Sequence, residues 1–323
     1  MHALTSWSRG SLNGRWRSAF LPALPLLLTC CAPSKPPVNS ASGPSAEQLI
    51  AAAEVEPGGL QAQHRQRLRA LANSERCPCQ ADRRPLARCS VGKGAVAGAS
   101  RSDGRCWRAP FAIRAILRGV VRGMTDAEIR QRLAQRFDGR LPHRFDLGRI
   151  PCRGKTSAPV AVVVFSDFQC PACSYGRRLA EEVVRLAGDR VRVCYKNLPL
   201  VTIHPDALLA AQAALAAHRQ GRFWPMHDRL FDGQRALQRP HLLAHARALG
   251  LDMTRFEADL DSRETRARVV ADVAEAERLR VRGTPTFYIN GREMTDPMMV
   301  PDMLDWVAEE LASPKGKPSK TSR

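Results

Sequence analysis

The most constraining feature of the sequence is an apolar segment that leads directly into two closely spaced cysteines. Residues 160–165 form a continuous, β-branched apolar run, which is typical of a strand buried on both faces of a sheet. After a short turn come Cys170 and Cys173, separated by Pro171 and Ala172. Pro171 suits the first position of a helix, and apolar residues at helical spacing follow it. This order predicts a strand, a turn that carries Cys170, and a helix that begins at Pro171.

The expected position of Cys170 gives its sulfur a distinct environment. At the N-terminus of a helix, the unsatisfied amides and the helix dipole stabilise a thiolate. Cys173 lies one turn into the helix, where we expect it to be more buried and able to attack a mixed disulfide at Cys170. The sequence therefore predicts an attacking thiol, Cys170, and a resolving thiol, Cys173.

Four segments of the chain resemble, in order, the motifs of the DsbA-like thiol–disulfide oxidoreductases. They lie within residues 165–173, 195–205, 221–227 and 281–287. The resemblance spans about residues 158–311 and implies an α/β, thioredoxin-like fold with a helical insertion at about 203–280. It also implies disulfide exchange with thiol- or disulfide-containing protein substrates. We expect no cofactor and no metal.

The last of these segments contains the residues that the resemblance assigns to substrate orientation. Thr284 and Pro285 match the loop that carries the family's cis-proline, so Pro285 is expected to be cis and to lie beside the sulfurs. The backbone of Thr284 would then pair with an extended substrate segment. Two departures concern Val164, where family members commonly have a glutamate, and Ala172, where strongly oxidising members have a histidine. Either Asp167 or water replaces the glutamate as proton carrier, or exchange is slower. Without the histidine we expect a less oxidising couple, and the direction of electron flow stays open.

Residues 1–31 have the order of a lipoprotein-type signal peptide. Arginines precede an apolar stretch at 19–28, which is too short to span a bilayer. The stretch ends in Leu-Leu-Thr-Cys-Cys, which resembles the bacterial lipobox, so Cys31 (or Cys30) is expected to carry the lipid. This predicts a lipid-anchored, periplasm-facing protein of the bacterial cell envelope that has a membrane redox partner. The alternatives are a signal cleaved without lipid attachment and an anchor that is retained.

Composition and periodicity divide the rest of the chain into four parts. We expect a flexible linker, a cysteine-rich helical domain, a DsbA-like thioredoxin domain and a basic disordered tail, at residues 32–46, 47–140, 150–314 and 315–323. Helical spacing predicts helices at 60–71, 111–121 and 125–137, and further strands are expected at 192–196 and 286–289. Thr125 and Glu128 form a capping box at the start of the third helix.

Ten cysteines favour an oxidising compartment. Cys152 and Cys194 are expected to be neighbours in the sheet, either as a structural disulfide or as two buried, inert thiols. A second group lies in the helical region: Cys77, Cys79, Cys89 and Cys106. For this group two structural disulfides rank first, a redox relay to Cys170 and Cys173 second, and a zinc site third, because the spacing is irregular for zinc. The relay hypothesis comes from a faint resemblance to CcmH-type domains.

The net charge of +19 comes from arginines scattered along the chain, without a basic run that alternates with aromatic residues. Nucleic acid is therefore not an expected partner. The leading hypothesis is an exported thiol–disulfide exchanger of open direction. One alternative is a dedicated reductase in cytochrome c maturation or another single-client pathway. From a different class comes a redox-inert binding module of an envelope complex.

Overall fold

The computed structural model describes residues 43–314, except for 57, 80–83, 92–104, 138–140 and 297. The expected signal peptide with Cys30 and Cys31, most of the expected linker and the expected basic tail lie outside the described residues. Within the described ranges, no helix is long and apolar enough to cross a membrane.

In the N-terminal helical region, the described residues between 43 and 137 form five helices around a hydrophobic cluster of their own. They are α1 (Ala46–Ala52), α2 (Ala62–Ser74), α3 (Leu86–Val91), α4 (Ala109–Val121) and α5 (Asp126–Phe137). The expected capping box is present, since Thr125 Oγ1 accepts from the Glu128 amide and Glu128 Oε2 accepts from the Thr125 amide. The three predicted helices correspond to α2, α4 and α5. The short helices α1 and α3 were not expected.

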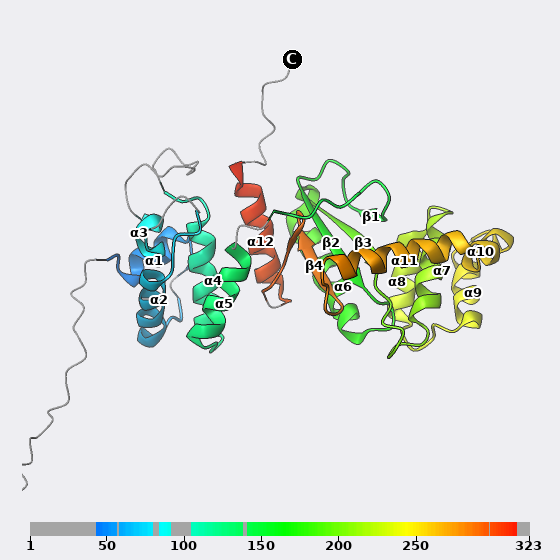
Figure 1. Cartoon of the computed structure of the whole chain (residues 1–323), viewed down its shortest axis with the longest axis horizontal. Coiled ribbons are helices and arrows are strands. Elements are labelled where there is room, and N and C mark those ends of the chain that lie inside the picture. Colours follow the sequence, from blue (N-terminus) through cyan, green and yellow to red (C-terminus); the bar gives the residue numbers. More distant parts are fainter. Residues whose placement is uncertain are drawn as a thin grey trace, which may run out of the picture. The chain divides into compact units, whose positions relative to one another are not determined.

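A five-stranded mixed sheet forms the centre of the second half of the chain (Figure 1). Its strands are β1 (Cys152–Arg153), β2 (Val160–Ser166), β3 (Val191–Asn197), β4 (Thr286–Ile289) and β5 (Arg292–Glu293), in the order β1-β3-β2-β4-β5. Strands β2 and β3 are parallel, and the other pairs are antiparallel. Every residue of β2 is buried, as expected for a continuous apolar run that has layers on both faces.

Alternate residues of β2 belong to two different clusters. Val162 and Val164 pack in the cluster that includes α6 (Pro171–Ala187) and α12 (Val300–Ala312), whereas Val163 and Phe165 pack in a cluster that includes Ala276 of α11 (Arg263–Arg278). A 3-10 turn, Gly188–Arg190, connects α6 to β3. Between β3 and α11 lie α7 (Ala207–His218), α8 (Phe223–Asp232), α9 (Arg239–Ala248) and α10 (Met253–Leu260). The predicted α/β fold with a helical insertion is confirmed.

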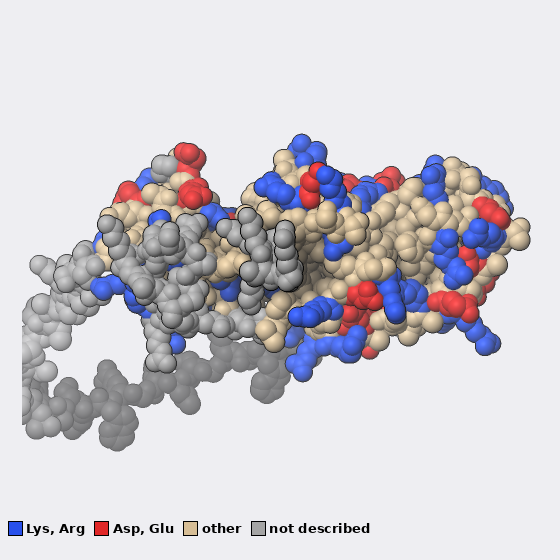
Figure 2. Space-filling model, turned by 90° about the horizontal axis from the view of Figure 1, so that it is seen from above, with Lys and Arg blue, Asp and Glu red and all other residues tan. Residues whose placement is uncertain are grey.

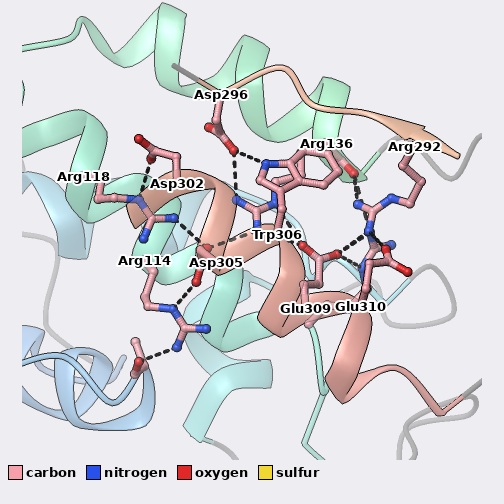
Figure 3. Close-up of polar contacts among 12 residues, drawn as sticks. Arg114, Arg118, Arg136, Arg292, Asp296, Asp302, Asp305, Trp306, Glu309 and Glu310 are labelled. Carbon is pink, nitrogen blue, oxygen red and sulfur yellow. Dashed lines mark hydrogen bonds and ion pairs between the residues drawn. The ribbon is translucent and has the colours of Figure 1, made fainter. Parts of the chain in front are cut away.

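The helical region contacts the C-terminal helix α12 through ion pairs (Figure 3). Arg114 of α4 donates to Asp305 at 2.5 Å, and Arg122 donates to Asp302 at 2.6 Å. Arg136 of α5 lies 2.9 Å from Glu309 and 3.1 Å from Asp305, and its side chain is only 1% exposed. Because α12 also packs against α6, this buried ionic interface joins the helical region to the layer that carries Cys170 and Cys173.

On the face drawn in Figure 2, the Lys and Arg side chains lie among Asp and Glu side chains. Surface ion pairs of this kind include the pair of Arg239 with Asp261 at 2.6 Å. On that face the basic side chains therefore form no continuous track.

Candidate active site

Among the described residues, the two free cysteines lie at the start of α6. Cys170 occupies the N-cap position with an extended backbone (φ −74°, ψ 121°), and Pro171 is the first helical residue. The Cys173 amide donates to the Cys170 carbonyl at 3.1 Å, which closes the first turn. The first N–H groups of a helix have no partner within the helix, and Pro171 has no N–H at all. A proline is therefore favourable at this position, which explains why the helix begins here. The Cys170 sulfur is therefore placed where helix amides and the dipole favour negative charge.

Both thiols are buried, and Cys173 is the more enclosed of the two. Cys170 is 7% exposed and Cys173 is 1% exposed, and Cys173 Sγ accepts a hydrogen bond from the Asp167 amide at 3.4 Å. Burial raises the pKa of the Cys173 thiol to about 12, although hydrogen bonds from Ser166 and Thr284 favour the thiolate. At neutral pH, Cys173 is a protonated thiol that must lose its proton before it can react.

The Thr284–Pro285 peptide bond is cis and lies beside the cysteines. Cys170 Sγ is 3.6 Å from the Thr284 carbonyl oxygen, although 114 residues separate the two. Gly176 allows this approach, because a Cβ at that position would lie 2.8 Å from Pro285 Cγ. The structure thus brings together all four residues that the sequence assigned to exchange and substrate orientation: Cys170, Cys173, Thr284 and Pro285.

Asp167 anchors the backbone around the site. Its carboxylate accepts from the amide of Gln169 at 2.7 Å and from that of Leu200 at 2.9 Å, and it lies 2.7 Å from His204 Nδ1. Asp167 is 1% exposed, so its charge is satisfied by these groups and not by water. The carboxylate joins the cysteine turn to the loop that follows β3.

A glutamine that sequence reasoning missed also supports the cysteine turn. Gln234 Nε2 donates to the Phe168 carbonyl at 2.8 Å and to the Cys170 carbonyl at 2.9 Å. It follows α8 and lies 64 residues from Cys170, and no motif surrounds it in the sequence. Only the tertiary fold shows its position.

The two departures from the family pattern have different surroundings. Val164 is buried in β2 and lies opposite Tyr195 in the β2–β3 register. Both residues pack in the same hydrophobic cluster as Cys173. Burial raises the pKa of Tyr195 well above its usual value, which keeps its hydroxyl protonated. Ala172 is exposed beside the cysteines and brings no charge to them.

The other described cysteines are paired in disulfides. Cys152 and Cys194 are joined across the β1–β3 register with a Cα–Cα distance of 4.0 Å. In the helical region, Cys77 is joined to Cys89, and Cys79 to Cys106. The sulfurs of Cys77, Cys79 and Cys106 lie within 4.8 Å of one another, so the group considered for zinc is the same group that forms these two disulfides.

Solved structures with similar folds cover about half of this chain. BdbD from Bacillus subtilis is 22% identical over 54% of this chain and 98% of its own, with a TM-score of 0.48. A thioredoxin-like oxidoreductase from Silicibacter pomeroyi is 27% identical over 51% of this chain and 93% of its own, with a TM-score of 0.47. The catalytic domain of ScsC from Proteus mirabilis is 22% identical over 57% and 99%, with a TM-score of 0.46.

The curated relatives carry the names of antiporters. This chain is 39% identical over 173 residues to Na(+)/H(+) antiporter NhaA 3 of Salinispora tropica, which is 54% of this chain and 26% of the relative. It is 42% identical over 147 residues to Na(+)/H(+) antiporter NhaA 1 of Salinispora arenicola, which is 46% and 22%. The chain therefore spans about a quarter of the length of the curated relatives it matches.

One protein-family model matches the chain directly. It is described as thioredoxin and covers residues 148–309, which is half of the sequence. The match includes both cysteines of the α6 turn, the insertion and the cis-proline loop.

Proposed function

The chain belongs to the thioredoxin family, and we propose that it exchanges disulfides with protein substrates through Cys170 and Cys173. The observation that carries the proposal is the asymmetry of the two thiols. Both thiols are buried, but Cys170 lies at the helix N-terminus beside Thr284, whereas Cys173 lies one turn further in and its pKa is raised to about 12. Attack therefore begins at Cys170, and Cys173 reacts second.

The exchange proceeds in two successive thiol–disulfide exchange steps. The Cys170 thiolate attacks one sulfur of a substrate disulfide, which forms a mixed disulfide and releases the other substrate sulfur as a thiolate that takes up a proton. Cys173 then loses its proton and attacks Cys170 Sγ, which releases the second substrate thiolate. The substrate is reduced by two electrons and the Cys170–Cys173 pair is oxidised; the same steps in reverse oxidise a substrate dithiol. The reduction potentials of the two partners decide the direction.

Thr284 and Pro285 are proposed to orient the substrate. The Thr284 carbonyl is within 3.6 Å of Cys170 Sγ, and this residue precedes β4, so its backbone is outside the ladder of the sheet. An extended substrate segment that pairs with Thr284 would bring its own sulfur next to Cys170.

The surface near the cysteine turn supports a protein as the substrate. Val201 and Ile203 are 54% and 68% exposed in the loop after β3. Asp167 holds that loop to the cysteine turn through the Leu200 amide. Exposed apolar side chains on a loop that is tied to the cysteine turn suit an unfolded or flexible client better than a small polar thiol.

We also propose that the protein works outside the cytoplasm, with a lipid on Cys31 or Cys30 and a membrane partner that restores its redox state. Three disulfides in the described part of the chain are those of a protein from an oxidising compartment. Replacing Cys30 and Cys31 together with serine should move the protein from the membrane fraction to the soluble fraction. If the double variant stays in the membrane fraction, the lipid assignment is wrong.

A single-client reductase is the second candidate, because the helical region adds a surface that disulfide exchange itself does not require. That region is joined through α12 to the helix that carries both thiols. The thiol state in cells separates the two functions: a general oxidase is held mainly oxidised, and a reductase mainly reduced.

Trapping with insulin tests the exchange chemistry. The reduced Cys173→Ala variant should form a covalent adduct with insulin that dithiothreitol releases, because the resolving thiol is absent. Cys170→Ser should form no adduct, and the Cys170→Ser/Cys173→Ala double variant is the matched control. An adduct that persists without Cys170, or a wild-type chain that cannot reduce insulin or oxidise a dithiol peptide, would overturn the proposal and favour a redox-inert binding module.

A further inference from the structure

A cavity of about 270 Å³ lies beside the resolving thiol. Its wall combines α6, β2, β3 and α8, and Cys173, Val164 and Tyr195 line it. Cys170 is not among the lining residues, so the cavity reaches the thiol pair through Cys173. Arg177 and Glu181 also line the cavity and are partly exposed.

The wall of the cavity is apolar, but three donors on its lining residues have no hydrogen-bond partner among the described residues. They are Tyr195 Oη, on a residue that is 1% exposed, Trp224 Nε1, and Arg177 Nε, which lies 3.8 Å from a Glu181 oxygen. The Tyr195 hydroxyl is close to Ser166 and Cys173, both of which line the same cavity. A buried donor without a partner costs free energy, and an acceptor on a bound molecule would remove that cost.

The charged residues at the cavity already have partners. Arg177 pairs with Asp232 at 2.8 Å, and Arg153 pairs with Asp228 at 2.7 Å. Arg185 pairs with Glu182 at 2.5 Å. A charged ligand would have to compete with these ion pairs, whereas a neutral ligand would not.

We propose that this cavity binds a small, neutral, largely apolar molecule that carries a carbonyl-type acceptor oxygen. The apolar body of the ligand would lie against Val164 and Val184, and its oxygen would accept from the Tyr195 hydroxyl. A cavity of roughly 150 Å³ is enough for benzene, so the larger space here suits a two-ring compound. The inference deepens the proposed function, because an occupant covers Cys173 and would slow its attack on a mixed disulfide.

Two probe molecules of the same shape test the ligand class: 1-tetralone, which has a carbonyl oxygen, and tetralin, which does not. Isothermal titration with the full chain should show that 1-tetralone binds about three- to tenfold more tightly than tetralin, the range of one hydrogen bond. Equal affinities, or no binding of 1-tetralone, would overturn the proposal.

Two variants locate the bound probe. Tyr195→Phe should reduce 1-tetralone affinity to that of tetralin, and Val184→Phe should abolish binding of both by filling the cavity. Circular dichroism verifies that each variant is folded. If Val184→Phe is folded and still binds 1-tetralone with wild-type affinity, the probe lies elsewhere and the proposal is wrong.

The effect on exchange is measured separately. In wild type, 1-tetralone should slow the release of glutathione from a mixed disulfide at Cys170, and in Val184→Phe it should not. Cys170→Ser should still bind 1-tetralone. Loss of exchange activity with binding retained would count against the proposed function alone, whereas normal exchange without 1-tetralone binding would count against the cavity alone.

Discussion

The Asp167 carboxylate lies 2.7 Å from His204 Nδ1, although the two residues are 37 positions apart in the chain. The same carboxylate accepts the amides of Gln169 and Leu200, and the amide of Asp167 donates to Cys173 Sγ. Asp167 therefore contacts both Cys173 and the loop that follows β3. Its loss should affect stability before it affects chemistry.

Asp167→Ala should lower the free energy of unfolding by about 2–4 kcal/mol, because it leaves buried amide donors without an acceptor. Urea denaturation of the oxidised chain measures this change. Asp146→Ala, which removes a carboxylate that is 66% exposed, should change the value by less than about 0.5 kcal/mol. Similar losses in both variants would mean that the Asp167 contacts contribute little.

The raised pKa of Cys173 predicts how the resolving step depends on pH. Because this pKa is about 12, only a small fraction of Cys173 is thiolate at neutral pH, and that fraction grows about tenfold with each pH unit. Release of glutathione from a mixed disulfide at Cys170 should therefore accelerate about tenfold per unit from pH 7 to 10. Quenched-flow sampling with mass spectrometry measures the loss of the glutathione adduct over time.

In Cys173→Ala, added free cysteine can release the glutathione. The rate of this release should stop rising with pH once the pH exceeds the pKa of free cysteine. If the wild-type rate levels off near neutral pH instead, a second group removes the proton from Cys173. Asp167, which lies next to the thiol, would then be the first residue to test by Asp167→Asn.

The disulfide between Cys152 and Cys194 should stabilise the sheet. Cys152→Ala/Cys194→Ala should lower the free energy of unfolding by about 2–4 kcal/mol, because the covalent link closes a loop between residues 42 apart. Denaturation by guanidinium measures this loss, and insulin reduction should stay near the wild-type rate. A variant as stable as wild type would show that these cysteines are not joined in the native protein.

Arg136 should be the most sensitive position in the ionic interface with α12. Arg136→Met removes a buried cation from Glu309, Asp305 and Asp296, and we expect a loss of about 3–5 kcal/mol. Arg130→Met, which breaks a pair in which the arginine is 48% exposed, should cost less than about 1 kcal/mol. Equal costs would contradict the buried network, and hydrogen exchange should show whether α4 and α5 lose protection in Arg136→Met.

The parts of the fold that the sequence predicted well are those in which local pattern and burial agree. The apolar runs predicted β2, β3 and β4 to within one residue at each end, because each strand is buried by layers on one or both faces. The capping box located the start of α5 for the same local reason. Likewise, the proline after Cys170 placed the start of α6.

The parts that the sequence could not predict depend on partners far along the chain. In the sequence, Arg136 has the pattern of a solvent-exposed helix residue. The carboxylates that bind it lie 160 to 173 positions further along the chain, on α12 and the segment before it. The arginines that give the chain its net charge are scattered in the sequence, yet several of them come together in this interface. Gln234 and the pairing of Cys77 with Cys89 are similar cases, since spacing alone does not determine which groups meet.

The two outer strands of the sheet, β1 and β5, each have only two residues, and the first of them is fixed to β3 by the Cys152–Cys194 disulfide. The unfolded clients proposed above would bring chains with unpaired strands, and a long open edge would invite them to add to the sheet. Short and covalently fixed edges give such chains little to pair with. A client can then be held for the lifetime of one sulfur–sulfur bond and leave when that bond is resolved, without becoming part of the sheet that held it.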